Sequence, residues 1–182
     1  PASQTPELKG LHYLTASNQP QLDASEKHDY QNKGRQISYS PYKVYRCCQH
    51  NVAMGWPRFV RNLWQETADN GLACWSYAPA KVEAEVGKKE KNITIETETN
   101  YPFSGQVNLT IESNNSVTFP LYLRIPKWCE NFAVKINGEE VTQKKKSGKY
   151  LKIERSWKPG DEIKIDMQME ISLTEWPRTG SV

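Results

Sequence analysis

The stretch Gln106–Ile125, QVNLTIESNNSVTFPLYLRI, decides the fold of this chain. On either side of Asn114-Asn115, apolar residues recur at every second position or crowd together as β-branched and aromatic side chains. Such alternation predicts a strand with one buried face, and an Asn pair between two such runs predicts a turn. The stretch is therefore expected to form two β-strands separated by a tight connection.

The same two-residue period continues through most of the chain after residue 71. Six further segments show it: Leu72–Ala78, Lys81–Val86, Asn92–Glu98, Phe132–Ile136, Tyr150–Arg155 and Glu162–Ile171. Turn signals separate these segments, and Asn137-Gly138 predicts a type I′ hairpin. Pro120 and Pro126 predict a sheet edge, a bulge or an early strand end. Eight or nine strands with no helix between them are typical of an antiparallel β-sandwich.

The first third of the chain has a different character. Residues 1–46 are polar and irregular, which predicts a long loop that lies on another surface. Residues 51–66 carry apolar side chains at three- and four-residue spacing, which predicts a helix capped by Asn51. Pro57 requires either that the regular helix begins near Trp56 or that it is kinked there.

We therefore expect residues 1–70 to be the end of one domain and residues 72–182 to be a β-sandwich domain. The chain begins at Pro1 without a signal-like segment, and we expect it to be a piece of a longer protein. Four Cys, two of them adjacent, leave the compartment open, with a periplasmic or secreted location slightly favoured.

The composition bounds what the chain can do. Its 182 residues are 37% hydrophobic and 25% charged, which is enough to bury a core and excludes disorder along the whole length. No apolar run approaches the roughly 18 residues that a membrane span needs. The net charge of +3 is mild and predicts no nucleic-acid partner. Six Trp and nine Tyr suit a carbohydrate-active protein, although large side chains in a β core give the same composition.

The adjacent pair Cys47-Cys48 is the strongest candidate in the sequence for a reactive or metal-binding site. The pair directly precedes the expected helix, where the helix dipole and the neighbouring Arg46 would lower a thiol pKa. Thiolates serve as nucleophiles and as ligands of soft divalent metals, so the pair could share a zinc ion, with His50 as a further ligand. The spacing leaves open the alternative that two small side chains are buried under the helix.

For the other residues with reactive side chains, the first interpretation is a structural role. Cys74 and Cys129 are expected in the core of the sandwich. His12 and His28 are expected either to pack within the irregular segment or to line a cleft. The carboxylates, Asp69 at the helix end among them, are expected on a solvated sheet face or in turns.

The sequence contains several short motifs that together match, in the same order, the pattern of one protein family. The central one is Tyr45–Phe59, YRCCQHNVAMGWPRF. The others are Leu11-His12-Tyr13, Asn18-Gln19-Pro20, Asp69–Leu72, Tyr77-Ala78-Pro79, Tyr101–Phe103, Leu123–Trp128, Asn137-Gly138 and Trp157–Asp161. Over nearly the whole chain this set resembles glycoside hydrolase family 127, long described as a domain of unknown function.

The resemblance implies an (α/α)6-barrel catalytic domain followed by β-sandwich domains. Residues 1–70 would then supply the last loop and helix of the barrel, and residues 72–182 the first sandwich. The upstream barrel of the same parent protein would be the partner of this sandwich, and an oligosaccharide or glycan would be the substrate.

The resemblance also implies the chemistry of a retaining β-L-arabinofuranosidase. Cys47 would be the nucleophile and a zinc ligand, and Cys48 a second zinc ligand. The acid/base Glu and the remaining zinc ligands would lie upstream of this chain, so the isolated chain should be inactive. Gln49-His50 stands where characterised arabinofuranosidases have Pro-Pro, which is a departure from their pattern. The candidate substrate contacts are His12, His28 and His50.

The alternative is a non-catalytic β-sandwich, either an accessory module that braces the barrel or a carbohydrate-binding module. Such a module would hold glycan through exposed aromatic side chains. The candidates are Trp128, Trp157 and Trp176, each of which could instead belong to the core or to a strand end.

Overall fold

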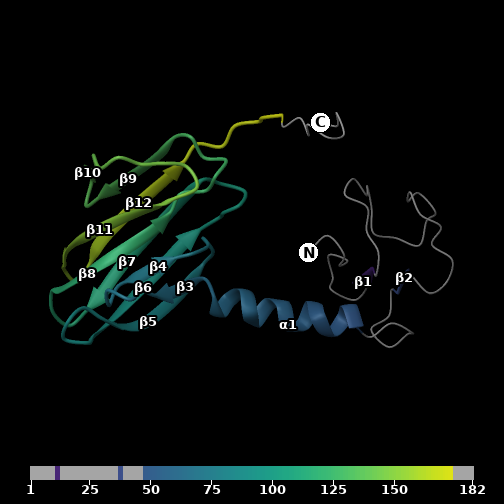
Figure 1. Ribbon diagram of the computed structural model, residues 1–182, viewed down its shortest axis with the longest axis horizontal. Helices are drawn as coiled ribbons and strands as arrows, with labels where there is room; N and C mark the ends of the chain where they lie inside the picture. Colours follow the sequence, from purple (N-terminus) through teal and green to yellow (C-terminus); the bar gives the residue numbers. More distant parts are fainter. Residues whose placement is uncertain (1–10, 13–36, 39–46, 174–182) are drawn as a thin grey trace. The chain divides into compact units, whose positions relative to one another are not determined.

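The computed structural model describes residues 11–12, 37–38 and 47–173 (Figure 1). The chain divides into two compact units, Pro1–Arg61 and Asn62–Val182. In the first unit, the short strands β1 (Leu11–His12) and β2 (Ile37–Ser38) pair antiparallel, and helix α1 (Cys47–Arg61) follows. The described part holds no helix with the length and apolarity to span a bilayer.

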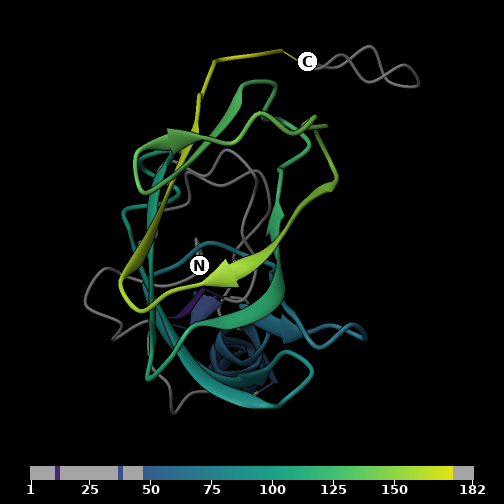
Figure 2. The same cartoon turned by 90° about the vertical axis from the view of Figure 1, so that its left-hand side faces the viewer.

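The second unit is a β-sandwich of two sheets, as the alternating sequence predicted. Figure 2 shows the two sheets as separate layers. One sheet has six strands in the order β10-β9-β12-β7-β6-β5, and the other has four in the order β11-β8-β4-β3. All neighbouring strands are antiparallel except β4 and β8. The strands are β3 (Trp64–Glu66), β4 (Leu72–Cys74), β5 (Ala80–Val86), β6 (Lys91–Thr99), β7 (Gln106–Ser113), β8 (Val117–Arg124), β9 (Phe132–Ile136), β10 (Glu139–Glu140), β11 (Tyr150–Trp157) and β12 (Asp161–Met167).

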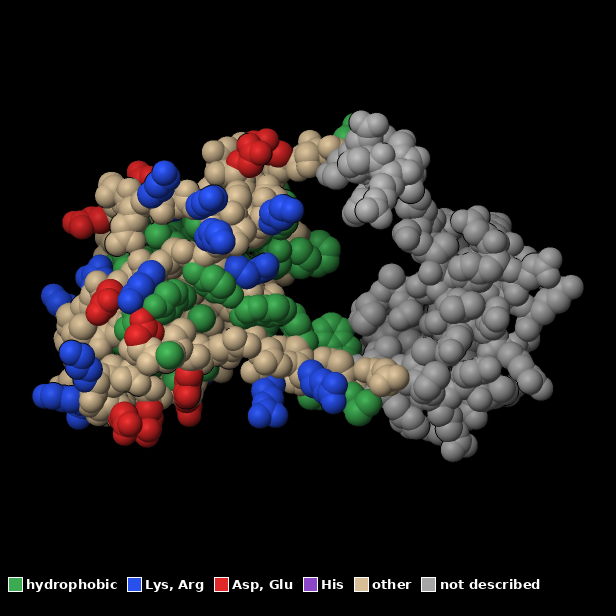
Figure 3. All heavy atoms as spheres, viewed as in Figure 1, with side chains coloured by type: hydrophobic (Ala, Val, Ile, Leu, Met, Phe, Trp, Pro, Cys, Tyr) green, Lys and Arg blue, Asp and Glu red, His purple; other side chains and the backbone are tan. Residues whose placement is uncertain are grey.

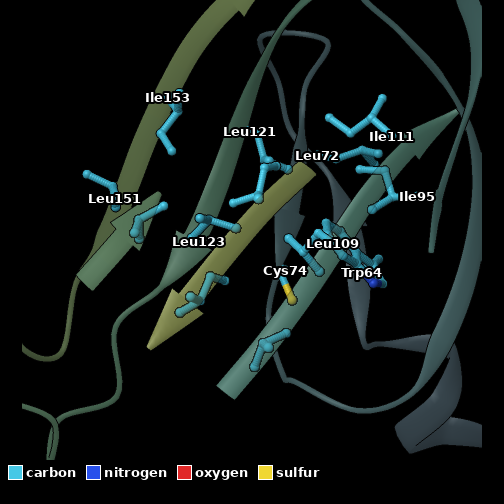
Figure 4. Close-up of a cluster of buried hydrophobic side chains, with 14 of the residues drawn as sticks. Trp64, Leu72, Cys74, Ile95, Leu109, Ile111, Leu121, Leu123, Leu151 and Ile153 are labelled. Carbon is cyan, nitrogen blue, oxygen red and sulfur yellow. The ribbon is translucent and has the colours of Figure 1, made fainter. Parts of the chain in front are cut away.

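The core lies between the two sheets and follows the alternation in the sequence. In Figure 4, side chains from β7 of one sheet and from β4 and β8 of the other meet in one cluster. Along β12 every second residue is buried, from Asp161 to Met167. Outside the core, Lys and Arg side chains are interspersed with Asp and Glu over the face drawn in Figure 3. The predicted solvated sheet face is thus confirmed for most carboxylates.

The boundary between helix and sandwich differs from the prediction. The helix covers Cys47–Arg61 rather than residues 51–66, so Asn51 is not its cap. Pro57 lies inside this helix, so the first alternative, a regular helix that begins near Trp56, is wrong. Trp64 does not extend the helix, because it starts β3 and is buried in the sandwich. The compact unit that contains the sandwich runs from Asn62 to Val182.

Two further predictions concern strand ends and turns. The edge interpretation of Pro120 is wrong, because β8 lies between β11 and β4. The pairing with β4 starts one residue later, at Leu121, so the proline falls just outside that ladder. Asn137 and Gly138 have φ values of 51° and 87° between β9 and β10, which confirms the predicted hairpin.

Trp157 was a candidate glycan contact, and the structure contradicts this role. Its side chain is fully buried, and its indole N–H donates a hydrogen bond of 3.0 Å to the carbonyl of Phe119. The rings of Trp157 and Phe119 pack with their centroids 5.9 Å apart. Trp128 is half-exposed, and Trp176 lies outside the described residues.

Candidate functional site

The adjacent cysteines occupy the first two positions of α1. The first backbone N–H groups of a helix have no partner within it, and the helix dipole places partial positive charge there. The first turn contains no acidic residue that would compete for that charge. This backbone setting favours thiolates over thiols at Cys47 and Cys48. The side chains of both lie outside what the structure describes, so their predicted roles stay predictions.

The predicted roles of the three histidines likewise stay predictions. His50 is three residues after Cys47 in α1, a spacing that places two positions on one face of a helix. His12 belongs to β1, which pairs with β2, and its side chain is not described. His28 lies outside the described residues. Within the described part of the chain, no group of three or more His, Cys, Asp and Glu is arranged to hold a metal.

The other two cysteines are core residues, as expected. Cys74 and Cys129 are free thiols with no exposed surface. Burial raises the pKa of Cys74 to about 12, and it also raises the pKa of Cys129. Each thiol donates to a backbone carbonyl two residues further on, of Ser76 and Asn131 respectively. Protonated, buried thiols are poor nucleophiles and poor metal ligands, so neither is a candidate for chemistry.

The sequence predicts Asp69 to be a solvated surface carboxylate, but in the structure it accepts several side-chain hydrogen bonds. Its carboxylate accepts hydrogen bonds from the Thr67 hydroxyl at 2.5 Å, the Tyr122 hydroxyl at 2.6 Å and the Lys152 ammonium at 3.0 Å. These hydrogen bonds hold the pKa of Asp69 well below its usual range, and the bond from Thr67 contributes most to this shift. The carboxylate therefore stays ionised and joins the loop before β4 to β8 and β11. We call Asp69, Thr67, Tyr122 and Lys152 the Asp69 cluster.

A second engaged carboxylate, Asp161, stabilises the turn between β11 and β12, which joins the two sheets. It is buried, and it accepts from the Asn137 side-chain amide at 2.8 Å and from the backbone N–H of Lys158 at 2.9 Å. Burial alone would raise its pKa, but these donors and the nearby Arg155 hold the pKa below its usual value. Both engaged carboxylates are therefore structural groups rather than free acids or bases.

One cavity of about 520 Å³ lies at the end of the sandwich where the β5–β6 turn approaches β8. Its lining includes the apolar Val86 and Phe119. The charged residues around it are Lys88 and Lys89 of that turn, Lys91 at the start of β6, Asp69 and Glu154. It includes no predicted site residue. The described structure thus places the two adjacent cysteines at the start of α1, with His50 three residues after Cys47 in the same helix.

Comparison with known proteins adds the family context. Residues 71–169 match the family model described as "Beta-L-arabinofuranosidase, GH127 middle domain". The search of curated proteins gave no match. A solved glycoside hydrolase has a TM-score of 0.76 at 24% identity, over 96% of this chain and 28% of its own, and shows the fold alone.

Two more solved structures belong to named enzymes. A GH127 β-L-arabinofuranosidase from Geobacillus stearothermophilus T6 has a TM-score of 0.74 at 28% identity, over 94% of this chain and 26% of its own. A GH127 β-arabinofuranosidase has a TM-score of 0.62 at 27% identity, over 72% of this chain and 23% of its own. This chain therefore spans about a quarter of the length of the structures it matches.

Proposed function

Since the chain belongs to glycoside hydrolase family 127, we propose that it is part of a retaining β-L-arabinofuranosidase whose nucleophile is Cys47. The observation that carries the proposal is the position of Cys47 and Cys48 in the first turn of α1, directly ahead of a sandwich that matches the middle domain of the family. The substrate class is a glycan with a β-L-arabinofuranosyl group.

The proposed reaction has two displacements. The Cys47 thiolate attacks the anomeric carbon, a C–S bond forms, and the C–O bond to the leaving group breaks. A carboxylic acid from outside this chain gives its proton to the leaving oxygen. Water then displaces the sulfur from the anomeric carbon, gives its proton to that carboxylate, and regenerates the thiolate. Two inversions retain the configuration of the sugar.

The donor chemistry of the pair fits zinc. Two thiolates supply half of a tetrahedral site, and the helix start favours their charged form. Zinc bound there would keep the nucleophile deprotonated at neutral pH. We propose that Cys47 and Cys48 are two of the ligands and that the others come from the parent protein. The isolated chain is then expected to lack glycosidase activity.

The test compares variants of the full-length parent protein on an aryl β-L-arabinofuranoside. We expect Cys47→Ala to lower kcat/KM by about three orders of magnitude or more, because it removes the nucleophile. Cys74→Ala is the matched control, since that thiol is protonated and buried away from solvent. Alkylation mapped by mass spectrometry should modify Cys47 at neutral pH and leave Cys74 unmodified. A Cys47→Ala variant with the activity of the parent would overturn the proposal.

A further inference from the structure

The outer face of the four-stranded sheet carries aromatic rings next to cations. Tyr150 of β11 lies opposite Arg124 of β8, and Lys152 lies opposite Tyr122 in the same ladder. Their neighbours along the strands, such as Leu123 and Leu151, are buried on the other side of the sheet. Alternation along a strand therefore places all four side chains on the outer face. With Trp75, which follows β4, they form what we call the aromatic–cationic face.

Two rings of this face are accessible, and two lie against cations, with Trp75 belonging to both pairs. Trp75 is 47% exposed and Tyr150 is 43% exposed. The guanidinium carbon of Arg124 lies 6.0 Å from the centre of the Trp75 ring, and the Lys152 ammonium lies 5.5 Å from the centre of the Tyr122 ring. Such cation–π contacts fix the orientation of a ring. In Figure 3, hydrophobic side chains likewise lie beside Lys and Arg on the face drawn there.

Arg124 has binding capacity that the described structure does not use. Its Nε atom is buried and has no hydrogen-bond partner among the described residues. No carboxylate in that part of the chain forms an ion pair with Arg124, whereas Lys152 is paired with Asp69 and Glu154. The guanidinium charge of Arg124 is therefore not neutralised by a carboxylate within the described residues.

Two further lysines, Lys127 and Lys149, lie near the end of β8 that carries Arg124. The backbone N–H of Ile125 bonds to the carbonyl of Lys149, and a Cβ atom at Gly148 would lie 3.9 Å from the Cβ of Lys127, so both lysines lie close to the start of β11. Neither lysine forms an ion pair within the described residues. The face therefore combines open ring surface with a guanidinium that no described carboxylate neutralises.

We propose that the aromatic–cationic face binds an acidic glycan. Trp75 and Tyr150 offer flat apolar surface to the C–H faces of sugar rings, and Arg124 offers a two-pronged donor to a uronate carboxylate. A neutral sugar would leave the guanidinium without a charged acceptor, which selects acidic chains. This site is independent of Cys47 and adds a binding function to the proposed glycosidase.

The test uses the 182-residue chain in native gels that contain polygalacturonate or, as a neutral comparison, arabinan. We expect polygalacturonate to retard the chain and arabinan to retard it much less. Trp75→Ala and Arg124→Gln should each raise the dissociation constant at least about fivefold, and added salt should weaken binding. Phe103→Ala and Lys164→Ala are the matched controls, because Phe103 is exposed in the β6–β7 connection and Lys164 is exposed on β12, both in the other sheet.

Circular dichroism and thermal melts check that each variant is folded. Equal mobility of the chain in gels with and without polygalacturonate would overturn the proposal. Equal retardation by arabinan, or an equal loss of binding in Phe103→Ala and Trp75→Ala, would do the same. None of these outcomes depends on glycosidase activity, so a failure here is distinguishable from a failure of the Cys47 proposal.

Discussion

At the residue scale, the same functional group has different roles according to its surroundings. Cys74 and Cys129 are buried, and burial keeps them protonated. Cys47 and Cys48 stand at a helix start, where the charged thiolate is favoured. Asp69 is exposed but engaged by three donors, while most other described carboxylates point into solvent.

The Asp69 cluster predicts a pH dependence of stability. The folded-state pKa of Asp69 is lower than its unfolded value near 4, so its contribution is present above pH 4 and is lost as the pH falls. We expect the melting temperature of Asp69→Asn to change less than that of the parent chain between pH 5 and about pH 2. Glu98→Gln is the control, an exposed carboxylate without such donors among the described residues. Parallel curves for Asp69→Asn and the parent would contradict the prediction.

The hydrogen bonds of Asp161 predict a loss of stability when its side chain is removed. Asp161→Ala would leave the backbone N–H of Lys158 and the side-chain amide of Asn137 without their acceptor. We expect the free energy of unfolding to fall by about 2 kcal/mol in urea titrations at pH 7. Asp166→Ala, an exposed neighbour on the same strand, should change it by less than about 0.5 kcal/mol. Equal losses in the two variants would show that the hydrogen bonds of Asp161 do not matter.

At the scale of elements, turns fix how the strands meet. Gly87 ends β5 with a φ of 74°, and a Cβ atom there would lie 2.6 Å from the carbonyl oxygen of Thr118 in β8. Gly138 also has a positive φ, 87°, but a Cβ atom there would meet nothing within 4 Å. The first glycine therefore permits a close approach of two sheets, whereas the second only permits a hairpin.

This difference between the two glycines is measurable. Gly138→Ala should cost about 1 kcal/mol of unfolding free energy, from backbone conformation alone. Gly87→Ala should cost clearly more, because the backbone of β8 must also shift. Chemical denaturation of both variants checks the order. A Gly87→Ala variant as stable as Gly138→Ala would mean that the turn moves away from β8 without penalty.

The sequence predicted elements well where one period dominates and poorly where periods overlap. Strands such as β7 and β12 alternate over seven or eight residues, and both were recognised. Leu63 and Trp64 continue the apolar spacing of the helix, so β3 was read as helix, although tertiary packing places Trp64 in the sandwich. A turn signal does not say whether the next strand joins the same sheet: β7 and β8 follow each other but lie in different sheets.

The sequence predicts only part of the site, because many of its contacts join residues that are far apart in the chain. The cysteine pair is a local motif and could be read from the sequence. The Asp69 cluster joins residues 53 and 83 positions apart, and no local pattern records such contacts. Trp75 and Arg124 likewise come together only through the parallel pairing of β4 and β8. Pairing register is set by the fold, so these groups needed the structure.

At the scale of the whole molecule, the sandwich has one core centred on large buried side chains. Trp157, Tyr77 and Phe119 are among the largest of them. Tyr77 also donates a hydrogen bond of 2.7 Å to the carbonyl of Arg124, which ties the crossing between the sheets to the end of β8. The core is thus held by packing together with a few internal hydrogen bonds.

A matched pair of tryptophans tests this core. Trp157→Ala should lower the free energy of unfolding by about 3–5 kcal/mol, since it leaves a cavity and the Phe119 carbonyl without its donor. Trp128→Ala, at a half-exposed ring, should cost much less. Thermal and urea unfolding of the two variants gives the comparison. Similar losses would contradict the assignment of Trp157 to the core.

The measurement that tests the central claim most directly is the zinc content of the full-length parent protein beside its Cys47→Ala and Cys74→Ala variants. The account predicts about one zinc ion per molecule in the parent and in Cys74→Ala, and a loss of both zinc and glycosidase activity in Cys47→Ala. A parent protein without zinc, or a Cys47→Ala variant that keeps metal and activity, would contradict it.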